Sequence, residues 1–204
     1  DIFVPGSTVN SFSNETLRWE KPKQFNTGFD IAVLKNKLTL NFDYFKKTVD
    51  GLLFVDSPPL YAGTSLPVAS NIGSTESKGV DLTLGFSENT KTFKFSTSLT
   101  FTTSENLVTA TNRDGTAMVT GGSYFNGQSQ SVTRFQKGYT PGYFYGFKTD
   151  GLFQTVGEIE QSPNQTGVVP GDIKFVDVNK DGVITDLDRT KIGDPFPDFT
   201  RGWS

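Results

Sequence analysis

The sequence contains no cysteine and no histidine among its 204 residues. Without these side chains the chain can form no disulfide, no thiol nucleophile, no Cys/His zinc site and no Ser-His-Asp triad. Metal binding is therefore restricted to oxygen ligands. Because no nucleophile lies beside a base in any recognisable pattern, we predict no catalytic residues and a protein that is not an enzyme.

The chain also lacks a basic excess and long hydrophobic runs. Its 19 Lys and Arg stand against 22 Asp and Glu, which gives a net charge of −3 and argues against a nucleic-acid partner. No stretch of eighteen apolar residues is present, so no transmembrane helix is predicted. Strands that cross a membrane are about half polar and would escape this criterion.

Aromatic residues and glycine are abundant instead. The chain has 19 Phe and 21 Gly, and aromatics make up 13% of it although hydrophobic residues reach only 34%. This mixture disfavours a helical bundle. It favours β-strands, in which aromatic and polar residues can share one strand.

Apolar and polar residues alternate with a period of two along much of the chain. In one run Leu38, Leu40 and Phe42 alternate with Thr39 and Asn41. The same pattern occurs in four runs: residues 25–33, 38–44, 80–86 and 93–101. Strict alternation over such lengths predicts antiparallel β-strands with two different faces.

The predicted connections between these runs are unequal in length. Residues 35–37 and 88–91 are short turns, whereas residues 53–71 and 108–137 are long segments that we expect to be loops. Short turns at one end and long loops at the other are typical of outer-membrane β-barrels.

Charged residues end each apolar face on the long-loop side. The four ends are at Lys23, Lys46, Lys78 and Glu105. The uncharged stretch between turn and charge is roughly nine to ten residues, about the length of a tilted strand that crosses the hydrocarbon core. We therefore expect outer-membrane lipid to contact this face, with Trp19 and other aromatics near its edges as a girdle.

A soluble fold explains the alternation as well. In this second interpretation the apolar faces pack inward in an extracellular β-sandwich, an adhesion or carbohydrate-binding module stabilised by calcium. It explains less well why the opposite faces are small and polar and carry few charges.

Several segments resemble the SusC/RagA-like family of TonB-dependent transporters. The first reads LRWEKPKQFNTGFD and the second NIGSTESKGVDL. The complete set is residues 17–30, 71–82, 143–154, 170–175 and 177–204, in the family's order.

The resemblance implies an all-β fold: antiparallel strands that form part of a large transmembrane β-barrel of about 22 strands with long extracellular loops. It also implies a bacterial outer-membrane location, a SusD-like surface lipoprotein as partner, energy from a TonB complex, and an oligosaccharide or peptide cargo. Residues 1–204 then form a partial barrel domain from the C-terminal half, without the plug and most strands, and Ser204 ends inside a strand.

One segment, residues 177–188, has the spacing of a twelve-residue calcium loop of the EF-hand or dockerin type. The expected ligands are Asp177, Asn179, Asp181, the backbone carbonyl of Val183, and Asp188. Gly182 occupies the sixth position, where the chain must turn sharply. The alternative is a metal-free turn, which the Asn-Lys-Asp-Gly sequence also favours. We expect a structural Ca²⁺ here, within an extracellular loop.

Aromatic residues also gather near two glycines. Tyr139, Tyr143, Phe144 and Tyr145 are candidates for contact with substrate or with the partner lipoprotein. The alternative is a girdle or a strand-packing cluster.

Overall fold

The computed structural model describes residues 14–56, 68–111, 118–125 and 128–204. The chain divides into two compact units, each treated separately below. The sheet unit comprises Asp1–Thr116, Gln136–Tyr139 and Pro197–Ser204, and the small unit comprises Ala117–Phe135 and Thr140–Phe196.

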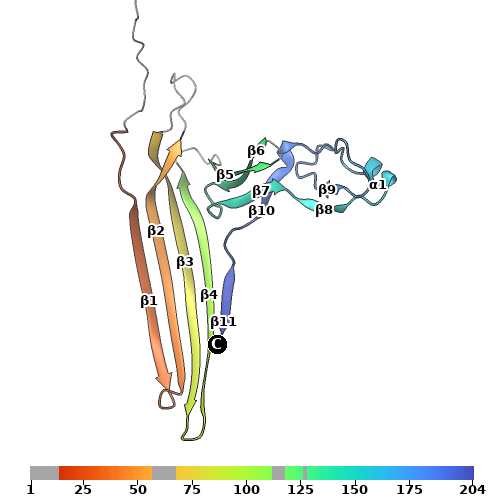
Figure 1. Cartoon of the computed structure of the whole chain (residues 1–204). Coiled ribbons are helices and arrows are strands. Elements are labelled where there is room, and N and C mark those ends of the chain that lie inside the picture. Colours follow the sequence, from red (N-terminus) through yellow and green to blue (C-terminus); the bar gives the residue numbers. More distant parts are fainter. Residues whose placement is uncertain (1–13, 57–67, 112–117, 126–127) are drawn as a thin grey trace, which may run out of the picture. The chain divides into compact units, whose positions relative to one another are not determined.

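The sheet unit is a single five-stranded antiparallel sheet (Figure 1). Its strand order is β1-β2-β3-β4-β11, so β1 and β11 are the edges. The strands are β1 (Lys21–Val33), β2 (Leu38–Asp56), β3 (Val68–Asn89), β4 (Lys94–Thr111) and β11 (Phe199–Trp203). The all-β, antiparallel prediction is confirmed.

Tight turns join β1 to β2 and β3 to β4 at the same end of this sheet (Figure 1). In the first turn Leu34, Lys35 and Asn36 have φ values of 56°, 58° and 65°. In the second, the Thr90 backbone N–H donates to the Phe93 carbonyl at 2.8 Å. Both predicted short connections are present, but the second spans residues 90–93 and not 88–91, because β3 continues to Asn89.

The long connections differ from the sequence expectation. Residues 53–71 were expected to be loop, but β2 continues to Asp56 and β3 begins at Val68, while residues 57–67 lie outside the described part. The two strands extend further than expected because the backbone hydrogen bonds between β2 and β3 can continue where the side-chain alternation stops. Register shifts after Asp50 and Leu52 obscure the period-two pattern there.

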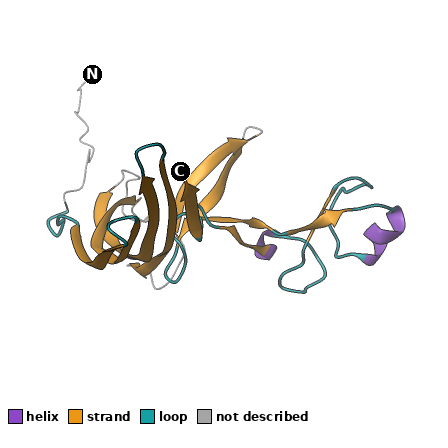
Figure 2. Cartoon of the chain, turned by 90° about the horizontal axis from the view of Figure 1, so that it is seen from below, coloured by secondary structure: helices purple, strands orange, loops and turns teal. Residues whose placement is uncertain are grey.

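The small unit contains short strands and a short helix (Figure 2). One sheet has the order β10-β7-β6-β5, and β8 pairs with β9. The strands are β5 (Met118–Phe125), β6 (Gln128–Phe135), β7 (Tyr143–Phe147), β8 (Thr149–Leu152), β9 (Ile173–Phe175) and β10 (Arg189–Gly193). The helices are α1 (Val156–Gln161) and the 3₁₀ turn η2 (Asp186–Asp188). The expected loop 108–137 is thus wrong in part, because it contains the β5–β6 hairpin.

Buried apolar side chains are few among the described residues. Ile72 and Val108 are buried in the sheet unit, and Phe135, Tyr143 and Phe153 in the small unit. The long strands are therefore held together mainly by their backbone ladders and by contacts within each sheet face.

No helix in the described part of the chain has the length and apolar character needed to cross a membrane.

Candidate functional site

Strand register places the apolar residues of the sheet unit on one face. Directly paired residues share a face, and Phe29, Phe42, Leu82 and Phe101 form one continuous row across four strands. The rings of Phe29 and Phe42 stack with their centroids 5.2 Å apart. Phe29 nevertheless remains 50% exposed, so this face presents a broad apolar surface.

The opposite face is polar and has small side chains. Asp43 and Asp81 pair directly on it, and the Asn41 side-chain amide donates to Asp30 Oδ1 at 2.7 Å. Phe45 is an aromatic exception on this face, and its ring covers the space that a Cβ at the facing Gly79 would take. The two faces therefore differ in both polarity and bulk.

Three ion pairs cross neighbouring strands where the apolar face ends. Lys23 pairs with Asp50 at 3.2 Å, Lys46 with Glu76 at 3.0 Å, and Lys78 with Glu105 at 2.9 Å. The register puts all six side chains on the face of Phe29. The sequence located four of these residues but missed Asp50 and Glu76, which are recognisable only as charges on the same face of a neighbouring strand.

Aromatic side chains gather toward the tight-turn end of the same face. Phe93 and Phe95 stack with their centroids 6.2 Å apart, and Phe86 lies 6.4 Å from Phe95. On β11 the Trp203 indole N–H donates to Thr97 Oγ1 at 2.7 Å. The apolar face is thus bounded by ion pairs at one end and by aromatic rings near the other.

The predicted calcium loop folds tightly around its first residue. Asp177 Oδ1 accepts the Lys180 backbone N–H, at 2.6 Å, and that of Asp181, at 3.3 Å, while its Oδ2 accepts the Gly182 N–H at 2.8 Å. Lys180 and Gly182 both have left-handed backbone conformations, with φ of 61° and 84°. These turns bring the first six residues of the loop around one carboxylate.

Asp188 closes the loop from the other side. Its side chain is fully buried, and its two oxygens accept backbone N–H groups from Thr185, at 2.8 Å, and Val178, at 2.9 Å. The N–H of Thr185, followed by that of Val178, lowers the pKa of Asp188 below its ordinary value. Asp188 is therefore ionised at neutral pH and acts as the internal anchor of the loop.

The remaining two side-chain ligands contact each other. The Asn179 amide donates to Asp181 Oδ2 at 2.8 Å, and Asn179 Oδ1 accepts the Asp181 N–H at 3.0 Å. Within the described ranges, no three acidic side chains are grouped closely enough to hold a metal. The donor types fit Ca²⁺, but in this arrangement their oxygens serve hydrogen bonds within the loop.

The predicted aromatic cluster is divided between the two units. Tyr139 belongs to the sheet unit, where its carbonyl accepts the Val108 N–H at 2.9 Å. Tyr143, Phe144 and Tyr145 lie on β7 of the small unit, and strand alternation points Phe144 away from its two neighbours. The Arg134 guanidinium lies 4.5 Å above the Tyr145 ring. A single aromatic platform made of all four residues is therefore not formed within either unit.

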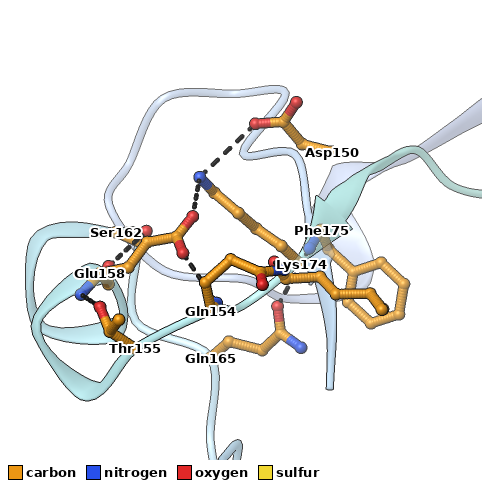
Figure 3. Close-up of polar contacts among 9 residues, drawn as sticks. Asp150, Gln154, Thr155, Glu158, Ser162, Gln165, Lys174 and Phe175 are labelled. Atoms are coloured by element: carbon orange, nitrogen blue, oxygen red, sulfur yellow. Dashed lines mark hydrogen bonds and ion pairs between the residues drawn. The ribbon is translucent and has the colours of Figure 1, made fainter. Parts of the chain in front are cut away.

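The sequence did not predict a polar network around Lys174 (Figure 3). Lys174 Nζ lies 3.2 Å from Glu158 Oε1 and 3.6 Å from Asp150 Oδ2. Glu158 also accepts the Gln154 N–H at 2.9 Å, and its own N–H donates to Thr155 Oγ1 at 3.2 Å. The Thr-x-x-Glu spacing was a usable signal for the start of α1, but no local pattern indicated the distant Lys174.

Two electrostatic effects follow from this network. The Gln154 N–H, and then the Lys174 ammonium, lower the pKa of Glu158, and Glu158 in turn raises the pKa of Lys174. Glu158 and Lys174 are therefore both charged near neutral pH, and their ion pair fastens α1 to β9.

Comparison with known proteins identifies relatives of this chain. The sequence profile of the family described as TonB dependent receptor-like, beta-barrel matches residues 2–187. TonB-dependent receptor P3 of Formosa agariphila is 33% identical over 207 residues, which cover 100% of this chain and 20% of that protein. TonB-dependent receptor SusC of Bacteroides thetaiotaomicron is 28% identical over 207 residues, covering 99% of this chain and 19% of SusC. The chain thus spans about one fifth of the length of these relatives.

Solved structures show the same fold. The RagAB peptide transporter matches with a TM-score of 0.69 and 22% identity, over 96% of this chain and 20% of that chain. The RagAB peptide importer in the open-open state matches with a TM-score of 0.66 and 23% identity. With the profile match over most of the sequence, these findings place the chain in the TonB-dependent receptor-like β-barrel family of the outer membrane, among proteins of the SusC/RagA type.

Proposed function

We propose that the sheet unit is a segment of the wall of an outer-membrane nutrient importer. The observation that carries this proposal is the register, which keeps apolar and polar residues on separate faces across the sheet. The apolar face contacts lipid, and the polar face lines the water-filled or plug-filled interior.

The length of the apolar face supports a membrane span. On β3, nine residues (79–87) separate Lys78 from Glu88. The two Cα atoms are about 33 Å apart along the strand, which becomes about 25 Å across the membrane at a tilt near 40°. This equals the usual height of the apolar band of outer-membrane barrels.

The alternative of a soluble calcium-stabilised sandwich receives less support. A sandwich would cover its apolar face, yet Phe25, Phe29, Leu84, Leu99 and Phe101 are all exposed. A barrel wall needs no such cover, because lipid takes its place.

We infer that the importer takes up an oligosaccharide or a peptide together with a SusD-like surface lipoprotein and with energy from a TonB complex. The similarity to SusC and the fold shared with the RagAB peptide transporter support this inference. The lipoprotein, the TonB complex and the cargo would act on the complete protein, of which this chain supplies part of the wall.

Uptake by whole cells tests this function. Cells that make the complete protein are expected to accumulate a labelled oligosaccharide or peptide only when TonB and the neighbouring lipoprotein are present. Equal accumulation without TonB would contradict the importer. Recovery of the complete protein from the aqueous fraction, without detergent, would contradict the membrane wall.

We further propose that residues 177–188 bind one structural Ca²⁺. Supporting features are the oxygen-ligand spacing and the tight winding around Asp177. A carboxylate oxygen that accepts one N–H keeps a second lone pair for a cation. Binding would require Asn179 and Asp181 to separate and Asp188 to turn one oxygen inward.

Calcium titration of the complete protein tests this site. Asp177→Asn and Asp181→Asn are each expected to weaken binding at least tenfold, because each removes a charged ligand. Asp186→Asn is the matched control, since the Asp186 side chain is 89% exposed and occupies a position outside the ligand set. Identical calcium affinity in all four proteins would refute the site.

A further inference from the structure

A cavity of about 300 Å³ lies at the long-loop end of the sheet unit, beside the start of β1. Its lining includes Arg18, Trp19, Lys21, Asp50 and Asn71. The volume is at the lower end of the range for small-molecule sites and suits a group about the size of one sugar.

Hydrogen bonds hold the wall of this cavity in place. Asn71 Oδ1 accepts the Arg18 backbone N–H at 2.8 Å, while its amide donates to the carbonyls of Arg18, at 2.8 Å, and Gly51, at 2.7 Å. Glu20 Oε1 accepts the Leu53 N–H at 3.0 Å. The segment before β1 is thereby fastened to β2 and β3 by side chains, which leaves the Arg18 guanidinium and the Trp19 ring to face the cavity or solvent.

The cationic groups in the lining differ from their neighbours in the sheet. Lys23, Lys46 and Lys78 each have a carboxylate partner. Among the described residues, neither the Arg18 guanidinium nor the Lys21 ammonium forms an ion pair. Asp50, the acidic residue of the lining, is neutralised by Lys23 at 3.2 Å. In the part of the chain that the structure describes, two positive charges of the lining therefore have no anionic partner.

The cavity belongs to the apolar side of the sheet. Lys21 and Asp50 pair directly, at register positions of the face that carries Phe29. They lie one row beyond the row of Lys23 and therefore on the long-loop side of the apolar band. This height corresponds to the head groups of the outer leaflet, not to the interior of the barrel.

We propose that this cavity binds the phosphorylated sugar head group of an outer-leaflet glycolipid. Arg18 and Lys21 pair with the phosphate, since unpaired cations near a membrane surface attract anionic lipid. Trp19, with 88% of its surface exposed, covers one face of the sugar as an apolar platform. The proposal depends on the outer-membrane location and not on the identity of the transported cargo.

Glycolipid retention by the complete protein tests the proposal. The protein is purified from outer membranes in a mild detergent, and bound lipid A-type glycolipid is measured by native mass spectrometry and by titration into nanodiscs. Arg18→Gln with Lys21→Gln is expected to weaken binding about 10–30-fold, because two cations are lost. Trp19→Ala is expected to weaken it several-fold.

Matched controls separate a specific site from a general charge effect. Lys35→Gln with Lys91→Gln removes the same charge from the tight turns at the other end of the sheet, and glycolipid binding should stay at the wild-type level. For each variant, the migration of an unheated sample on an SDS gel is compared with that of a heated sample, which verifies that the barrel has folded. Equal losses in the two double variants would overturn the proposal.

The same assay distinguishes a membrane glycolipid from a free sugar phosphate as the ligand. Dephosphorylated glycolipid is expected to bind poorly, and free glucose 1-phosphate is expected to compete only weakly because it lacks the membrane anchor. Full competition by the free sugar phosphate would overturn the lipid assignment. Because the readout is bound lipid, failure of cargo uptake in whole cells leaves this test unaffected.

Discussion

The sheet unit and the small unit hold their strands in different ways. In the sheet unit, the four strands β1 to β4 have 13 to 22 residues and are joined in long continuous ladders, and side-chain contacts lie on the two exposed faces. In the small unit the strands have 3 to 8 residues, and buried or networked charges such as Asp188 and Lys174 connect the segments.

This difference shows which changes each unit tolerates. A long ladder with lipid on one side is sensitive to the polarity and bulk of each face, because register fixes which face a residue occupies. A unit of short strands is sensitive to the loss of individual hydrogen bonds, because few ladder bonds remain to compensate.

The largest expected effect comes from placing a charge on the apolar face. Leu84→Arg, at a side chain that is 40% exposed, should destabilise the folded barrel by about 2–4 kcal/mol because the guanidinium lies near the middle of the membrane. Thr83→Arg, one residue away on the polar face, should cost much less. Denaturant unfolding of the complete protein in lipid measures both. Equal losses would mean that the two faces do not differ in environment.

A smaller effect is expected from adding one methyl group. A Cβ at Gly79 would collide with the Thr103 carbonyl and lie 2.6 Å from the Phe45 ring. Gly79→Ala should therefore destabilise by about 1–3 kcal/mol. Gly157→Ala, in α1 with no atom within 4 Å of the new Cβ, should instead stabilise the small unit by about 0.5–1 kcal/mol. The unfolding midpoints of the two variants test this. A smaller destabilisation by Gly79→Ala than by Gly157→Ala would contradict it.

The Lys174 network should give a local, pH-dependent effect. The folded pKa of Glu158 lies below its ordinary 4.5, so its contribution is present above pH 4.5 and is lost as the pH falls through the folded value. Lys174 has a folded pKa above 10.5, so its contribution is lost only as the pH rises through that value. The protection of α1 and β9 amides against hydrogen exchange, relative to an unstructured chain at the same pH, should fall at both limits in the wild type. In Glu158→Gln the loss of protection at acid pH should disappear. If that loss stayed unchanged, Glu158 would not be the group that causes it.

The smallest effect is expected at the ion pairs that end the apolar face. Glu105→Gln breaks a pair whose side chains are both about half exposed, so the cost should be about 0–1 kcal/mol and should shrink in high salt. Glu160→Gln in the small unit, an exposed position, is the control and should change nothing measurable. A salt-independent loss well above 1 kcal/mol at Glu105 would show that the pair lies deeper in the membrane.

Much of the sheet was predictable because its signal is local. Leu38, Leu40 and Phe42 alternate with polar residues, and the turn at Lys35 is only four residues long, so both strands and their hairpin follow from adjacent positions. The β5–β6 hairpin was missed because residues 118–135 are rich in Gly, Ser, Thr and Gln and show no apolar alternation. The charges that end the apolar face were found singly, but their partners Asp50 and Glu76 were not, since pairing depends on the neighbouring strand.

By itself, the sequence determined the strand periodicity, the restriction to oxygen ligands, the order of the calcium-loop residues and the family resemblance. Each of these is a property of residue types at fixed spacings along one chain. Tertiary structure decided the cross-strand ion pairs, the division of Tyr139 from Tyr143, the Lys174 network and the cavity beside Arg18. These features join residues that are far apart in the chain, and only the register and the folding of distant segments bring such residues within contact distance.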